Sequence, residues 1–159
     1  METLQEYALI AEIVSGIAVV FSLIYVGFQI RANTAEIRLE SIHSITTGYR
    51  EQALNYVHNE ALGIVWGKIL NAEQLTEKEV FLFANNLYSN LMLLEETYYR
   101  SLAGYLNEDF LNAKLHLIEL KILSSPQIRK QHEKMVNEKI YTPDFIDWLD
   151  SKLQRSTLF

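Results

Sequence analysis

The stretch that decides the fold is ALIAEIVSGIAVVFSLIYVGFQI, residues 8–30 of a 159-residue chain. From Ile13 to Ile30 it contains no charged residue, and Glu12 stands just before this uncharged part. A helix rises about 1.5 Å per residue, so roughly 20 apolar residues cross the hydrocarbon core of a bilayer, which is about 30 Å thick. The length and composition of the stretch therefore predict a transmembrane helix.

Two other interpretations of this stretch fit less well. A secretory signal peptide has basic residues before a shorter apolar core and a cleavage site after it. Here residues 1–12 are acidic, without Lys or Arg, and the sequence FQIRANT that follows has no cleavage signature. A buried helix in a soluble core would normally have a polar face in a domain of this size.

Basic side chains are distributed unevenly around the predicted span. Arg31, Arg38 and Arg50 follow it, whereas residues 1–30 contain no Lys or Arg. Because basic residues remain on the cytoplasmic side, we expect a single-pass protein with its N-terminus outside and its C-terminal part inside. The expected domains are a transmembrane anchor, residues 1–32, and a cytoplasmic α-helical domain, residues 33–159.

Small and polar residues recur every three or four positions along the span, beginning at Ala8. Ser15, Ser22 and Gln29 are one heptad apart, which keeps them aligned in a left-handed packing of helices. Membrane helices associate through small residues and polar contacts, since lipid provides no hydrophobic drive between them. We therefore predict a parallel homo-oligomer whose seam or pore is one stripe: Ala11, Ser15, Ala18, Ser22, Tyr25 and Gln29. The alternative is a lone anchor that tolerates these residues.

The composition narrows the classes of partner and chemistry. The net charge is −6, with no basic stripe that could contact the phosphates of a nucleic acid or anionic lipid. The chain has no cysteine, which excludes disulfides, thiolate metal sites and cysteine catalysis. The lack of disulfides agrees with a cytoplasmic domain.

Helical periodicity continues beyond the span. Residues 31–58 contain no Pro, and apolar residues recur on one face, so one helix should leave the membrane and continue to about His58. A break would be expected first at Asn33-Thr34, whose side chains compete for backbone hydrogen bonds. The expected apolar face consists of Ile42, Ile45, Tyr49, Ala53 and Tyr56.

Start signals mark the helices that follow. Asn59, the capping box Thr76 to Glu79, Asn107, Ser125-Pro126 and Thr142-Pro143 each begin a helix, and no strand pattern is present. The sequence thus predicts an all-α fold, an N-terminal transmembrane helix that continues into a cytoplasmic bundle of about four to five helices. The expected core includes Val80, Ala84, Leu87, Leu91, Leu94, Tyr98, Leu111, Leu115, Ile118 and Ile122.

Few residues indicate chemistry. Glu40 and His43 have the Glu-x-x-His spacing of carboxylate di-iron bundles, but the second copy that such a site needs is missing. Glu95-Glu96 interrupts an apolar helix, and Arg100 is the expected partner of Glu96. Triad, phosphate-loop and dinucleotide motifs are absent from the sequence. We therefore expect no enzyme activity, no catalytic residue, no cofactor and no metal.

Three amides lie on the same helix as Glu95. Asn85, Asn86 and Asn90 could line a small polar pocket, or they could be exposed or bonded to helix ends. Of these two interpretations, we expect the second.

The apolar helix ends in Gln29-Ile30-Arg31-Ala32-Asn33-Thr34. In this the chain resembles a group of short, uncharacterised bacterial single-pass membrane proteins whose apolar helix ends in Gln-Ile-Arg-x-Asn-Thr. Residues 36–153 are similar to the helical domain of that group, including Glu95-Glu96, the turn from Gly104 to Asn107, and a late helix that begins with Pro. The resemblance implies this architecture and a bacterial inner membrane, and it provides no catalytic residues.

Two functions agree with these patterns. The first is a single-pass inner-membrane protein that self-associates through its transmembrane helix and presents a helical interaction or sensor domain to an unidentified cytoplasmic partner or ligand. The alternative is a small homo-oligomeric ion channel or membrane-permeabilising effector whose pore is lined by Ser15, Ser22 and Gln29. A pore would place the stripe along a central water-filled axis, whereas a scaffold would bury it at helix contacts.

Overall fold

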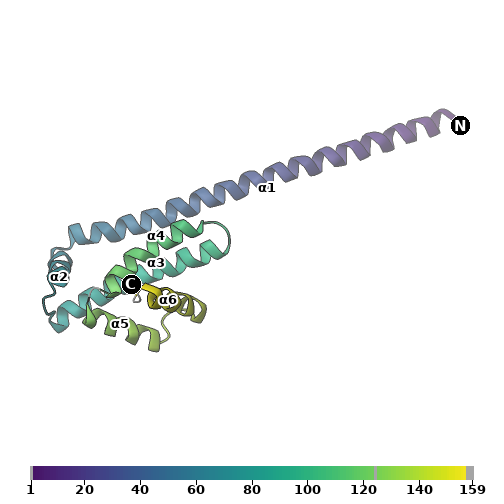
Figure 1. The fold of residues 1–159 in the computed structure, drawn as a ribbon. Coiled ribbons are helices and arrows are strands. Elements are labelled where there is room, and N and C mark those ends of the chain that lie inside the picture. The colour runs from purple at the N-terminus through teal and green to yellow at the C-terminus, as the bar shows by residue number, and fades with distance from the viewer. Residues whose placement is uncertain (1, 124, 157–159) are drawn as a thin grey trace. The chain divides into compact units, whose positions relative to one another are not determined.

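The computed structural model describes residues 2–123 and 125–156, which form six helices and no strand. In chain order the helices are α1 (Glu2–His58), α2 (Glu60–Leu70), α3 (Glu77–Leu102), α4 (Glu108–Leu123), α5 (Pro126–Asn137) and α6 (Pro143–Ser156) (Figure 1). The predicted all-α fold, a long N-terminal helix that continues into a bundle, is confirmed.

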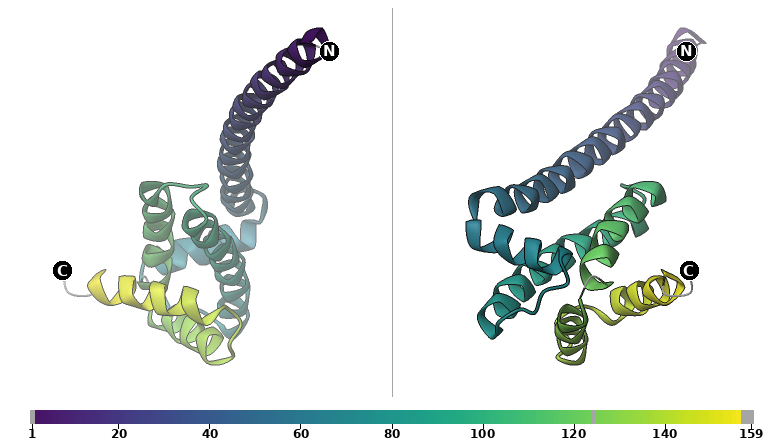
Figure 2. Two further views of the ribbon diagram at one scale, coloured as in Figure 1. Left: turned by 90° about the vertical axis from the view of Figure 1, so that its right-hand side faces the viewer. Right: turned by 60° about the vertical axis from the view of Figure 1, so that its left-hand side comes forward.

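The chain divides into two compact units, Met1–Glu40 and Ser41–Phe159. The described residues of the first unit all belong to α1. The second unit contains the last part of α1 together with α2 to α6, and within it α4 returns alongside α3 (Figure 2).

Helix α1 is continuous to His58, as predicted, and it runs through Asn33-Thr34 without an interruption. The hydroxyl of Thr34 donates a hydrogen bond to the carbonyl of Ile30, 2.8 Å away, one turn earlier in the same helix. This bond satisfies the side chain without displacing a backbone amide, so Asn33-Thr34 does not interrupt the helix.

Polar side chains cap the starts of α2, α3 and α4, as the sequence predicted, whereas Ser125 makes no side-chain cap bond at α5. Asn59 accepts a hydrogen bond from the backbone of α2, and Asn107 does the same for α4. Thr76 and Glu79 form the expected reciprocal capping box at α3. Gly104 follows the end of α3 with φ of +76°, a conformation that favours glycine because it has no Cβ.

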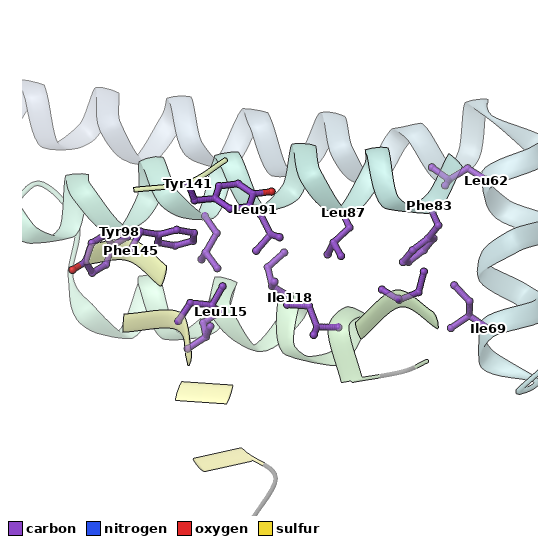
Figure 3. Close-up of a cluster of buried hydrophobic side chains, with 14 of the residues drawn as sticks. Leu62, Ile69, Phe83, Leu87, Leu91, Tyr98, Leu115, Ile118, Tyr141 and Phe145 are labelled. Atoms are coloured by element: carbon purple, nitrogen blue, oxygen red, sulfur yellow. The ribbon is translucent and has the colours of Figure 1, made fainter. Parts of the chain in front are cut away.

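The core of the second unit is centred on α3, which contacts α2, α4 and α5. One stripe of α3 supplies fully buried apolar side chains, and the facing helices add their own (Figure 3). At one end Phe83 stacks on Trp66, and at the other Tyr98 packs against Phe145 and Trp148. The other buried members include Leu62, Ile69, Leu87, Leu91, Leu94, Leu111, Leu115, Ile118, Ile122, Ile128 and Leu149.

Truncation of a core leucine should show how much this packing stabilises the second unit. Leu91→Ala removes a side chain with no exposed surface, so we expect a loss of about 2–5 kcal/mol in the free energy of unfolding. The matched control is Leu120→Ala on α4, whose side chain is 53% exposed and whose loss should be about 0.5 kcal/mol. Chemical denaturation followed by circular dichroism measures both. Equal losses in the two variants would contradict the assigned core.

Candidate functional site

The predicted stripe residues lie on α1 in the first unit. All six are exposed, namely Ala11, Ser15, Ala18, Ser22, Tyr25 and Gln29, and the helical repeat gathers them on one side of α1. The side chain of Ala8, where the stripe begins, lies outside the described part of the structure. Among the described residues, α1 alone is long and apolar enough to cross a membrane, and nothing in its most apolar window is buried.

The polar side chains of the stripe are hydrogen-bonded within their own helix. Ser15 Oγ donates to the carbonyl of Ala11 at 2.7 Å, and Ser22 Oγ donates to the carbonyl of Ala18 at 2.9 Å. Gln29 Nε2 donates to the hydroxyl of Tyr25 at 2.9 Å. Because an unsatisfied polar group in hydrocarbon is unfavourable by several kcal/mol, these local bonds reduce the cost of placing the stripe in lipid.

The rest of this surface is apolar and open. Phe21 and Leu23 are each 67% exposed, and large aliphatic side chains cover the neighbouring positions. Soluble monomers rarely expose a continuous apolar surface of this extent. By length and composition, the first unit could therefore span a membrane.

The second unit contains a buried polar cluster where the end of α1 packs on α3 and α4. The inward face of α1 agrees with the expected one at Ile45, Tyr49 and Tyr56 and differs at Ile42 and Ala53, which are exposed. Ile45 is fully buried as expected. The residues that face inward are Ser41, Ile45, Gly48, Tyr49, Gln52 and Tyr56.

Amide and hydroxyl groups connect α1 to α3 in this cluster. Tyr56 donates its hydroxyl proton to Asn86 Oδ1 at 2.6 Å, and Gln52 Nε2 donates to Ser89 Oγ at 2.7 Å. Asn90 Nδ2 donates to the carbonyl of Asn86 at 2.7 Å and lies 3.4 Å from Gln52 Oε1. Asn86 and Asn90 are buried in this helix contact, whereas Asn85 is exposed and donates to the carbonyl of Phe81 at 2.9 Å in its own helix.

Two lysines of α4 complete the cluster. Lys121 Nζ donates to Asn90 Oδ1 at 2.9 Å and lies 5.2 Å from the centre of the Tyr56 ring. Lys114 Nζ lies 5.0 Å from the centre of the Tyr49 ring. Both geometries are cation–π contacts. Burial lowers the pKa of Lys121 to about 8 and raises the pKa of Tyr56 to about 12.

The hydroxyl of Tyr49 is the poorly hydrogen-bonded group of this interface. It is buried without a hydrogen bond of normal geometry among the described residues. Burial raises the pKa of Tyr49, and the nearby Thr97 hydroxyl opposes that rise only in part. A buried hydroxyl without a partner destabilises the packed state by about 1–3 kcal/mol.

The glutamates singled out in the sequence, Glu95 and Glu96, each contact a partner that stabilises the fold. Glu96 pairs with Arg100 at 2.6 Å, as predicted. Glu95 accepts hydrogen bonds from the backbone amide and the hydroxyl of Thr142, at 2.9 and 2.6 Å, immediately before α6. Within residues 2–123 and 125–156, no group of three or more His, Asp or Glu side chains could hold a metal ion.

A sequence signal for the polar cluster exists in the spacing of its members. Gln52 and Tyr56 are four residues apart on α1, and Asn86 and Asn90 are four residues apart on α3. Residues at this spacing share a helix face, so two such polar pairs predict a polar contact between the helices that carry them. The asparagines were among the sequence candidates, whereas Gln52 was not, and Tyr56 was expected only as part of the apolar face.

No protein-family model, curated protein or solved structure matches this chain. The fold and the two sites are therefore the basis of any functional assignment.

The titration of Lys121 should be visible in the stability of the protein. Its pKa is about 8 when folded and 10.5 when unfolded, so between pH 8 and 9.5 the unfolded chain binds more protons. The free energy of unfolding should therefore rise by about 1 kcal/mol from pH 7.5 to 9.0, where an unfolded tyrosine, with a pKa near 10, is still mostly protonated. Denaturant titrations at the two pH values measure this rise. In Lys121→Met the rise should disappear, and an equal rise in both proteins would exclude Lys121 as its source.

Proposed function

We propose that this chain is a single-pass inner-membrane protein that self-associates through its transmembrane helix and presents a cytoplasmic helical interaction or sensor domain. The observation that carries the proposal is the first unit of α1. Its uncharged stretch from Ile13 to Ile30 exposes apolar side chains, and its polar groups are confined to one stripe.

The membrane assignment rests on length and on the local hydrogen bonds. The uncharged stretch is long enough to cross most of a bilayer core, and small adjustments at its ends complete the span. A helix satisfies its backbone internally, which lipid requires. Ser15, Ser22 and Gln29 likewise form their side-chain hydrogen bonds within the helix.

Self-association is supported by the chemistry of the stripe. Ala11, Ser15, Ala18 and Ser22 are small, which allows two helix backbones to approach closely. Gln29 uses one of its amide protons within the helix, and an amide has a second proton and a carbonyl oxygen to offer to another copy. The seam is favoured over a pore because the serine hydroxyls already donate within the helix and do not need water.

The orientation and location follow from the flanking residues. The excess of Arg after the span supports a cytoplasmic second unit. The resemblance of residues 29–34 to the ends of bacterial single-pass helices supports the inner membrane. In this proposal the second unit is a binding or sensing domain for an unidentified partner or ligand and not an enzyme.

The seam can be tested by filling the small positions. Ser15→Leu with Ser22→Leu adds bulk where the helices should approach, so we expect the oligomer in mild detergent to weaken about tenfold. Analytical ultracentrifugation over a range of detergent concentrations measures this. The matched control is Val14→Leu with Phe21→Leu, one position earlier at the same spacing, which should leave the association unchanged. A monomeric parent protein would leave only a lone anchor.

Cysteine cross-linking separates a seam from other arrangements, because the chain has no native cysteine. Single cysteines at positions 15, 18, 22 and 25 should cross-link efficiently, and those at 13, 20 and 24 weakly. A flat profile would contradict the seam. Ion flux through reconstituted protein that the Ser15→Leu, Ser22→Leu pair abolishes would instead support a pore lined by the same residues.

The proposed orientation predicts the result of a reporter fusion. A reporter that is active only in the cytoplasm should be active when it is fused after Phe159, because Arg31, Arg38 and Arg50 hold this side of the span inside. Activity of a periplasmic reporter at the same position, with the cytoplasmic one silent, would reverse the topology.

A further inference from the structure

The core of the second unit closes without α1. Its buried cluster is built from side chains of α2 to α6 and their connections, and Tyr56 of α1 only touches the edge of it. Residues 41–58 are all described, and Ile45 is the one large apolar side chain among them that is fully buried. The apolar stabilisation of the bundle therefore does not depend on this segment.

The segment is held by polar groups on α3 and α4, together with the buried side chain of Ile45 and the edge contact of the Tyr56 ring with Trp66. Its contacts with Asn86, Ser89 and Asn90 are hydrogen bonds, and its rings lie beside Lys114 and Lys121. Water can replace such contacts at small net loss, unlike the burial of apolar surface.

The opposite side of the segment is already in contact with solvent. Glu51, Ala53, Leu54, Asn55 and Val57 are exposed, so the segment covers α3 with one face and is covered by nothing described on the other. Local openings occur where buried apolar contacts are few. This segment has fewer of them than the helices of the core cluster.

We propose that residues 41–58 of α1 form a strap that releases from α3 and α4 while the bundle of α2 to α6 stays folded. Release uncovers a polar surface on α3 and α4 that includes Asn86, Asn90, Thr97 and Lys121. Because the strap belongs to the same helix as residues 2–40, a force on that helix can shift the equilibrium between the docked and released states. The inference does not require the membrane assignment.

Thiol labelling of the full-length protein tests whether the strap releases. The chain has no cysteine of its own, so only an introduced thiol can react. Thr97 and Leu94 are both fully buried on α3, but Thr97 lies near Tyr49 of the strap and Leu94 lies in the core. The thiol of Thr97→Cys should react at least about tenfold faster than that of Leu94→Cys. Any destabilisation by Leu94→Cys would raise the core rate and reduce this difference, so the comparison is conservative.

A second pair of substitutions tests what holds the strap. Gln52→Ala with Tyr56→Phe removes its hydrogen bonds to α3 and should speed labelling of Thr97→Cys about tenfold while leaving Leu94→Cys unchanged. The matched control is Glu51→Ala with Asn55→Ala, the same spacing on the exposed face, which should change neither rate. Equal parent rates at the two thiols, an equal acceleration of both by the double substitution, or no acceleration of either would overturn the proposal.

Discussion

The second unit depends on α3 having two chemically different faces. One face is an uninterrupted apolar stripe that includes Leu87, Leu91 and Leu94, and it gathers α2, α4 and α5 around itself. The other carries Asn86, Ser89 and Asn90 and receives the end of α1.

The two faces stabilise their partners to different degrees. A buried leucine contributes several kcal/mol when its packing is complete, whereas a hydrogen bond contributes about 1 kcal/mol net because water competes for both of its partners. The polar face contributes less free energy of packing than the apolar face, but it specifies the arrangement of the helices more narrowly. Paired amides accept few alternative arrangements, and an unpaired one would be unfavourable.

Most of the fold could be predicted from the sequence because its signals are local. Thr76 and Glu79 form the capping box that their spacing indicates, and Gly104 ends α3 in the left-handed conformation expected of a terminating glycine. The apolar repeats of α3 and α4 identified the core, with Val80 only partly buried at its edge.

Which side of α1 faces the bundle could not be predicted from the sequence of α1 alone. Ile42 and Ala53 fit an apolar face by periodicity but are exposed, and the helix turns Gln52 inward because α3 presents Ser89 at the facing position. Deciding this from sequence requires knowing which two helices meet. The partner of the stripe from Ala11 to Gln29 is harder still to predict, because the expected partner is a helix of another molecule.

The glycine at position 48 gives the contact of α1 with α3 a single register. A Cβ at this position would lie 3.0 Å from Cδ1 of Leu93, so the leucine occupies a notch in the helix surface. The inward residues one turn away on either side are Ile45 and Gln52, and both are larger than glycine. A shift of α1 by one turn would therefore bring a larger side chain against Leu93, so the docked contact is keyed to a single register.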